Sequence, residues 1–117
     1  MGIQIAGPAT VTVAGPEVVF VLEDTGGALV SILVLIKGQP SIRHEEPDED
    51  AGGDTRSLQP GTYECGIQIS AFREGALGIT YRTVASADGE VFASAEGVVP
   101  KDPGAAFGFR KFTLVVT

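Results

Sequence analysis

The sequence contains few of the residues that most often carry chemistry or covalent cross-links. Its 117 residues include one cysteine, one histidine and no tryptophan. A single cysteine excludes an internal disulfide, which is consistent with a cytoplasmic protein or with an assembly that needs no disulfides. The one histidine, His44, lies in an acidic stretch, and no Gly-x-Ser-x-Gly elbow, P-loop or Cys-x-x-Cys motif occurs. We therefore expect no enzyme of these classes.

Basic residues and long apolar runs are also scarce. Eight Lys and Arg stand against 15 Asp and Glu, giving a net charge of -7, and the basic residues are scattered. Nucleic-acid binding needs a clustered basic face, so we expect no nucleic-acid partner. The longest apolar run, residues 28–36, is too short to cross a bilayer as a helix. Residues 1–20 show no signal peptide, and the sequence leaves the localisation open.

Alternation of apolar and polar residues is the main pattern that is present. No window shows the stripe of an amphipathic helix, and 16 glycines and 7 prolines are spread as in a chain of many turns. We predict one all-β domain over residues 1–117, an antiparallel two-sheet β-sandwich of Ig-like or jelly-roll type with eight or nine short strands. The alternation is seen in segments 10–13, 62–72, 77–85 and 109–116, and segment 17–24 (EVVFVLED) is β-branched and aromatic.

Glycine-containing turns suggest how the strands connect. Residues 25–27, 74–75 and 88–89 are predicted to be hairpin turns, because glycine readily adopts positive φ. The segments 62–72, 77–86 and 91–98 follow one another closely, so we predict that they form a consecutive meander within one sheet.

Residues 28–36 (ALVSILVLI) break the alternation, because both faces are apolar except at Ser31. Three explanations are open: a strand covered on both faces by loops, a strand whose outer face is an oligomer contact, or a short buried helix. The contact residues would be Leu29, Leu33 and Leu35 or, in the opposite phase, Val30, Ile32 and Val34. Phe107 and Phe109 are further interface candidates, with core residues at a strand entry as the alternative.

The stretch HEEPDEDAGGD is the most acidic part of the chain and contains many potential metal ligands. It does not match an EF-hand, because Gly52 lacks a side chain and Gln59 cannot supply a bidentate carboxylate. His44 with Glu45 suits zinc or iron poorly, because adjacent residues on an extended chain point in opposite directions. We interpret residues 44–57 as a solvated acidic loop, and we expect the protein to have no cofactor. A loose Ca²⁺ site remains the alternative, with Asp48, Asp50 and Asp54 as its ligands.

The sequence Asp24-Thr25-Gly26, which follows a hydrophobic strand, resembles the signature of aspartic proteases. Retroviral-type members of that family are small all-β homodimers, and the resemblance implies that Asp24 would share a proton with its symmetry mate and activate water. It covers three residues. Glu23 stands where the family has an apolar residue, and Gly27 stands where it has Ala or Ser.

Residues 58–65 (LQPGTYEC) resemble the E–F corner of immunoglobulin-like domains. There, a tyrosine two residues before a cysteine bonds back to the main chain, and Tyr63 and Cys65 have this spacing. The second cysteine and the core tryptophan of antibody domains are missing. Cys65 is then most simply a small buried hydrophobic residue, and both tyrosines are expected to point inward.

These observations favour a non-enzymatic structural or interaction module that acts through self-assembly or protein–protein binding. Its partner would be another copy of the chain or a different protein, as in virion, appendage or surface-assembly subunits. The alternatives are a Ca²⁺-dependent binding module and an aspartic protease dimer that uses Asp24.

Overall fold

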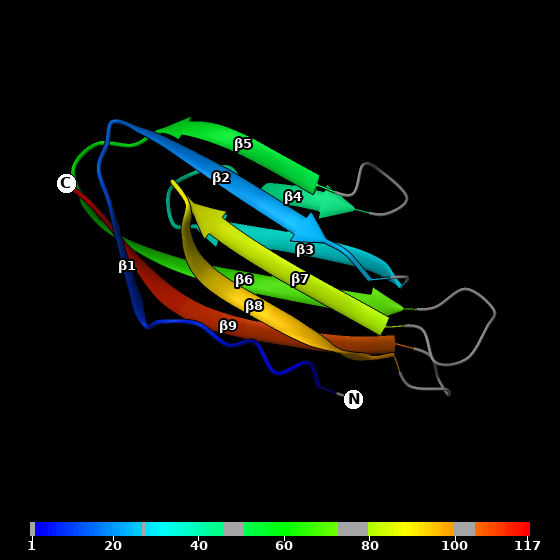
Figure 1. Ribbon diagram of the computed structural model, residues 1–117. Coiled ribbons are helices and arrows are strands. Elements are labelled where there is room, and N and C mark those ends of the chain that lie inside the picture. The colour runs from blue at the N-terminus through cyan, green and yellow to red at the C-terminus, as the bar shows by residue number, and fades with distance from the viewer. Residues whose placement is uncertain (1, 27, 46–50, 73–79, 100–104) are drawn as a thin grey trace.

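Nine strands account for most of the residues that the structure describes. A computed structural model of the protein (Figure 1) describes residues 2–26, 28–45, 51–72, 80–99 and 105–117. No helix occurs among them, so none is long and apolar enough to cross a membrane. The predicted all-β class is confirmed. The strands are β1 (Thr10–Val13), β2 (Glu17–Asp24), β3 (Leu29–Ile36), β4 (Ile42–Glu45), β5 (Ala51–Ser57), β6 (Gly61–Phe72), β7 (Thr80–Ala87), β8 (Glu90–Val98) and β9 (Ala105–Val116).

The strands form two sheets that lie one against the other (Figure 1). The five-stranded sheet has the order β1-β9-β6-β3-β4, and the four-stranded sheet has the order β5-β2-β7-β8. The paired strands run antiparallel, except that β1 runs parallel to β9. The two-sheet, sandwich-like architecture agrees with the prediction. The prediction that all strands pair antiparallel is wrong for β1.

The parallel pairing of β1 follows from the path of the N-terminal segment. This segment runs beside β9 in the same direction: the Ile3 amide donates to the Phe107 carbonyl at 2.8 Å, and β1 pairs with β9 further on. Between these two points, Ala6 forms a bridge with Ser94 of β8 in the other sheet. The segment thus links the two sheets along one side.

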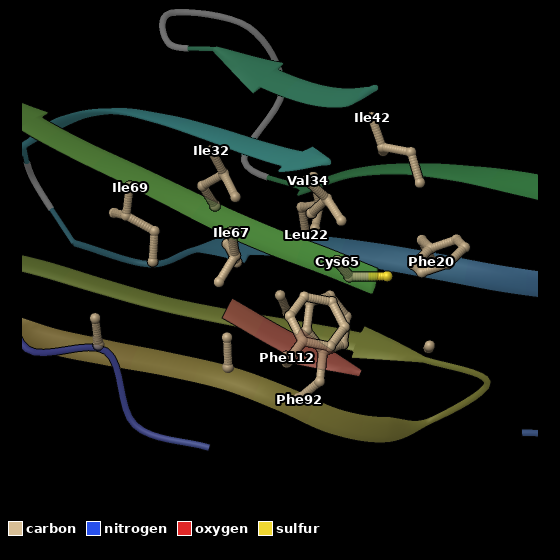
Figure 2. Close-up of a cluster of buried hydrophobic side chains, with 14 of the residues drawn as sticks. Phe20, Leu22, Ile32, Val34, Ile42, Cys65, Ile67, Ile69, Phe92 and Phe112 are labelled. Carbon is tan, nitrogen blue, oxygen red and sulfur yellow. The ribbon is translucent and has the colours of Figure 1, made fainter. Parts of the chain in front are cut away.

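The core lies between the sheets, and the strands place alternate residues in it. In β2, Val18, Phe20 and Leu22 are fully buried and alternate with more exposed residues. Figure 2 shows the aromatic centre, where the rings of Phe92 and Phe112 stack with centroids 4.6 Å apart. Phe20 meets Phe92 edge to face at 6.3 Å. These rings bury a large apolar area, the main favourable contribution to folding.

Two arginines close the sides of the sandwich. Arg56 of β5 donates to the carbonyls of Pro40 (2.6 Å) and Ser41 (3.0 Å), which precede β4 in the other sheet. Arg110 of β9 donates to the carbonyls of Pro8 (2.9 Å) and Gly7, in the N-terminal segment that pairs with β8. A guanidinium group has several rigidly arranged donors, so each arginine ties two segments together.

Two predicted connections are wrong. β6 lies in the five-stranded sheet while β7 and β8 lie in the other, so residues 62–98 do not form one meander. β2 and β3 also belong to different sheets, so the predicted hairpin between them is wrong, and the predicted turn at 74–75 lies outside the described residues. The turn at 88–89 is confirmed, because it joins the paired strands β7 and β8. Asp88 and Gly89 have φ of 50° and 79°, the positive values of a type I′ hairpin.

The acidic stretch contains more regular structure than the sequence suggested. His44 belongs to β4 and residues 51–57 form β5, so the loop is shorter than the predicted 44–57. β5 pairs along β2, and a Cβ at Gly53 would lie 2.6 Å from the Phe20 carbonyl oxygen. Glycine therefore permits this close approach of the two main chains. Residues 46–50 lie outside the described part of the chain.

Candidate functional site

The five interface candidates lie on one surface, the outward side of the five-stranded sheet, which we call the five-strand face. In β3, Val30, Ile32 and Val34 point into the core with at most 1% exposure. Leu29, Leu33 and Leu35 therefore point outward. This placement selects the first of the two phases and excludes the helix interpretation of residues 28–36.

The strand register brings the outward residues of β3 and β9 close together. Leu33 pairs with Gln68 of β6, and Gln68 pairs with Phe109 of β9, so the three form one row across the sheet. The neighbouring row contains Ser31, Ser70 and Phe107. Phe107 and Phe109 are 50% and 47% exposed and Leu35 is 40% exposed, so the alternative of two core phenylalanines is wrong. Large apolar side chains with this much exposure are a feature of binding surfaces.

Gly66 shapes the centre of this face. The Phe109 ring lies over it, so that a Cβ at Gly66 would come within 2.8 Å of Phe109 Cζ. A hollow of about 640 Å³ lies beside this contact, and Leu35 and Phe109 line it together with Lys37, Glu64 and Lys111. A smaller hollow of about 140 Å³ lies beside Leu33, Arg43 and Gln68 on the same face. The face therefore has both projecting rings and recesses.

The charged groups around the larger hollow are mainly basic. Lys37 Nζ lies 3.0 Å from Glu64 Oε2, and both side chains are 78% exposed, so water screens this ion pair strongly. Lys111 makes no ion pair within the described residues. The sequence analysis did not identify Lys37, Gly66 or Lys111. The available signal was a glycine in the middle of an alternating strand, which often marks a close approach of another group.

Asp24, the aspartate of the protease-like sequence, is 3% exposed. Its Oδ1 accepts a hydrogen bond of 3.1 Å from the Gly26 amide. This contact holds the turn after β2, a common role for aspartate in such turns. A Cβ at Gly26 would lie 2.4 Å from the Thr80 carbonyl oxygen, so the glycine also has a packing role. The aspartic protease hypothesis stays a prediction.

The proposed Ca²⁺ ligands lie mostly outside the described residues. Asp48 and Asp50 belong to residues 46–50, and Asp54 forms a salt bridge with Arg56. His44 is 4% exposed and points into the core, so the expectation of a solvated His44 is wrong. Within the described residues, no three His, Cys, Asp or Glu side chains gather as a metal site would require. The Ca²⁺ hypothesis stays a prediction.

Cys65 and Tyr63 behave as the sequence predicted. Burial raises the pKa of the Cys65 thiol to about 11, although a backbone hydrogen bond with Leu114 lowers it in part. The thiol is therefore neutral at physiological pH, consistent with a small core residue. The Tyr63 hydroxyl donates to the Gln59 carbonyl at 2.7 Å, which is the predicted bond back to the main chain.

Comparison with known proteins identified no relative of this chain. No protein-family model matches the chain, and no curated protein and no solved structure matches it.

Proposed function

We propose that the protein is a non-enzymatic structural module that acts by self-association, and that the five-strand face is its contact surface. One observation carries this proposal: half-exposed Phe107 and Phe109 lie beside Leu33 and Leu35 on a single sheet face. β3 is apolar on both sides although only one side faces the core. A second apolar side has no role in the stability of an isolated two-layer sandwich, and it is explained by a partner that covers it.

The size of the face and its apolar content are sufficient for a stable contact. The molecule measures 46 × 25 × 21 Å, so its broad faces are large enough for the roughly 800 Å² per partner that a standard interface buries. Fully burying a phenylalanine or leucine side chain contributes about 1.5–3 kcal/mol. Three half-exposed side chains therefore supply a useful part of the association free energy, and aromatic side chains are common anchors of such contacts.

We further propose that the fold is Ig-like rather than a jelly roll. Two features support this: the bond from Tyr63 to Gln59, and the strand order β9-β6-β3-β4, which corresponds to G-F-C-C′. β2 and β5 then correspond to the neighbouring strands B and E. The hairpin of β7 and β8 is a departure, because it stands between the F-like and G-like strands and pairs with the other side of β2.

Light scattering after size-exclusion chromatography tests the proposed self-association. The wild-type protein is expected to have a molar mass above 12.1 kDa at micromolar concentration, increasing with concentration. Phe109→Asp should return it to a monomer, because the charge would have to be buried in the contact. Gln59→Asp, an equal charge change at an exposed turn outside the face, is the matched control. A wild-type monomer throughout this range would overturn the proposal.

A further inference from the structure

We propose that the surface that covers the five-strand face is the opposite face of a second copy, so that copies associate head to tail. This inference rests on the proposed function and specifies its partner. The opposite surface is the outward side of the β5-β2-β7-β8 sheet, which we call the four-strand face.

Exposed apolar residues occur on both faces. The large hydrophobic side chains with the greatest exposure on the five-strand face are Leu35, Phe107 and Phe109. The four-strand face has Val19 (45%) and Val91 (49%), with Val98 (53%) further along β8. Val91 pairs with Ser86, which also pairs with Val21, so these two valines share a row, and Val19 lies beside the 88–89 turn. Each face therefore has an apolar area for the other to cover.

The charges of the two faces are complementary. The five-strand face has the pair Lys37–Glu64 together with Lys111, which has no acidic partner within the described residues. The four-strand face has its own exposed pair, Arg82 and Glu96, with Nε and Oε2 3.8 Å apart. Glu17 and Glu23 of β2 are further acids of this face, and neither makes an ion pair among the described residues.

The uncompensated charge is thus positive on one face and negative on the other. Pairing the five-strand face with itself would bring two Lys111 side chains, one from each copy, into the same contact. Pairing it with the four-strand face places Lys111 opposite a surface that contains Glu17 and Glu23, and opposite charges favour encounter and set orientation.

A contact between two different faces has a consequence that a two-fold contact lacks. Each added copy leaves one free five-strand face and one free four-strand face at the ends of the assembly. Association therefore continues beyond the dimer. It gives a closed ring if the repeated rotation from copy to copy returns to the first copy, and an open chain if it does not. The same charges make the association weaker as salt concentration rises, because exposed ions are screened.

Mixing two variants tests the arrangement. Phe109→Asp disables the five-strand face, and Val19→Lys disables the four-strand face by placing a cation toward Lys111 of the neighbouring copy. In sedimentation velocity, each variant alone should be monomeric, and an equimolar mixture should form a dimer with one copy of each, because one intact face of each kind remains. The wild type should form species larger than a dimer.

The outcomes separate this inference from the proposed function. Suppose that Val19→Lys associates as the wild type does and that mixing the two variants forms no additional dimer. Self-association then stands, and the head-to-tail contact is overturned. If the wild type is monomeric, both fail. Circular dichroism checks that the variants are folded, and Leu35→Asp with Val91→Lys is a second pair in case one variant is not.

Discussion

The Phe109 ring covers the main chain of Gly66, at a point where a Cβ would lie 2.8 Å from Cζ and 2.9 Å from Cε2. Gly66 belongs to β6 and pairs with Lys111 of the neighbouring strand β9, so Phe109 of the same strand is its diagonal neighbour. This relationship keeps the ring close to the sheet, and Gly66 and Phe109 both line the hollow beside Leu35.

Gly66→Ala should weaken self-association with little effect on folding. The new methyl group pushes the Phe109 ring outward, and the free energy of unfolding should change by less than about 1 kcal/mol, because the ring is half exposed and can rotate. Sedimentation equilibrium and urea unfolding measure the two quantities. The same substitution in a Phe109→Ala background is the control, since no ring remains to be displaced. An equal effect on association in both backgrounds would contradict the interpretation.

Phe92→Ala should strongly destabilise the fold. The Phe92 side chain is fully buried between Phe20 and Phe112, and removing such a ring from a core typically costs about 3–5 kcal/mol. The neighbouring Val91 is 49% exposed, so Val91→Ala is a matched control and should change the free energy of unfolding by less than about 1 kcal/mol. Equal losses for the two variants, measured by urea unfolding, would show that the core lies elsewhere.

Tyr63→Phe should reduce stability by about 0.5–1.5 kcal/mol, the usual net contribution of one hydrogen bond. The substitution removes only the hydroxyl that donates to the Gln59 carbonyl at 2.7 Å. Tyr81→Phe is the control, because the Tyr81 hydroxyl makes no hydrogen bond within the part of the chain that the structure describes. Chemical denaturation of the two variants side by side measures the difference. A larger loss of unfolding free energy for Tyr81→Phe than for Tyr63→Phe would contradict the assigned role of Tyr63.

The Cys65 thiol should react slowly with a disulfide reagent at pH 8. Burial raises its pKa from 9.0 to about 11, so only a small fraction is thiolate, and the sulfur is also shielded. Unfolding in guanidinium should make the reaction fast. Rapid labelling of the folded protein at pH 8 would contradict this assignment.

The same shift predicts a dependence of stability on pH. The folded pKa lies above the unfolded one, so the contribution of the neutral thiol is complete below pH 9.0 and is lost as the pH rises to about 11. Unfolding curves of the wild type and Cys65→Ala across this interval should therefore converge. Parallel pH profiles would show that Cys65 does not titrate as assigned.

The Ca²⁺ hypothesis makes a separate prediction. If Asp48, Asp50 and Asp54 bind the ion, millimolar Ca²⁺ should raise the Tm, and Asp50→Ala should abolish the rise, because a ligand that binds only the folded state stabilises it. Asp88→Ala, which removes an acid from the 88–89 turn, is the matched control and should leave the Ca²⁺ effect intact. A Tm that does not respond to Ca²⁺ in the wild type removes the hypothesis.

From the sequence alone the all-β class could be predicted, and the resemblance of residues 58–65 to an Ig-like corner implied the bond made by Tyr63. These features depend on alternation and short spacings, which are local properties of the chain. Cys65 and Tyr81 were placed inside for the same reason. The inward side of residues 28–36 could not be predicted, because a strand that is apolar on both sides contains no signal for which side faces the core.

The neighbours of each strand could not be predicted from the sequence and are known from the fold. Period-two alternation shows that a segment is a strand but not its partner, so β6 and β7 were wrongly placed in one sheet. The contact of Phe109 with Gly66 was invisible for the same reason, because it requires β9 to return beside β6. Packing of the four-stranded sheet against one side of β3 buried Val30, Ile32 and Val34 and left its leucines outward, on one face with Phe107 and Phe109.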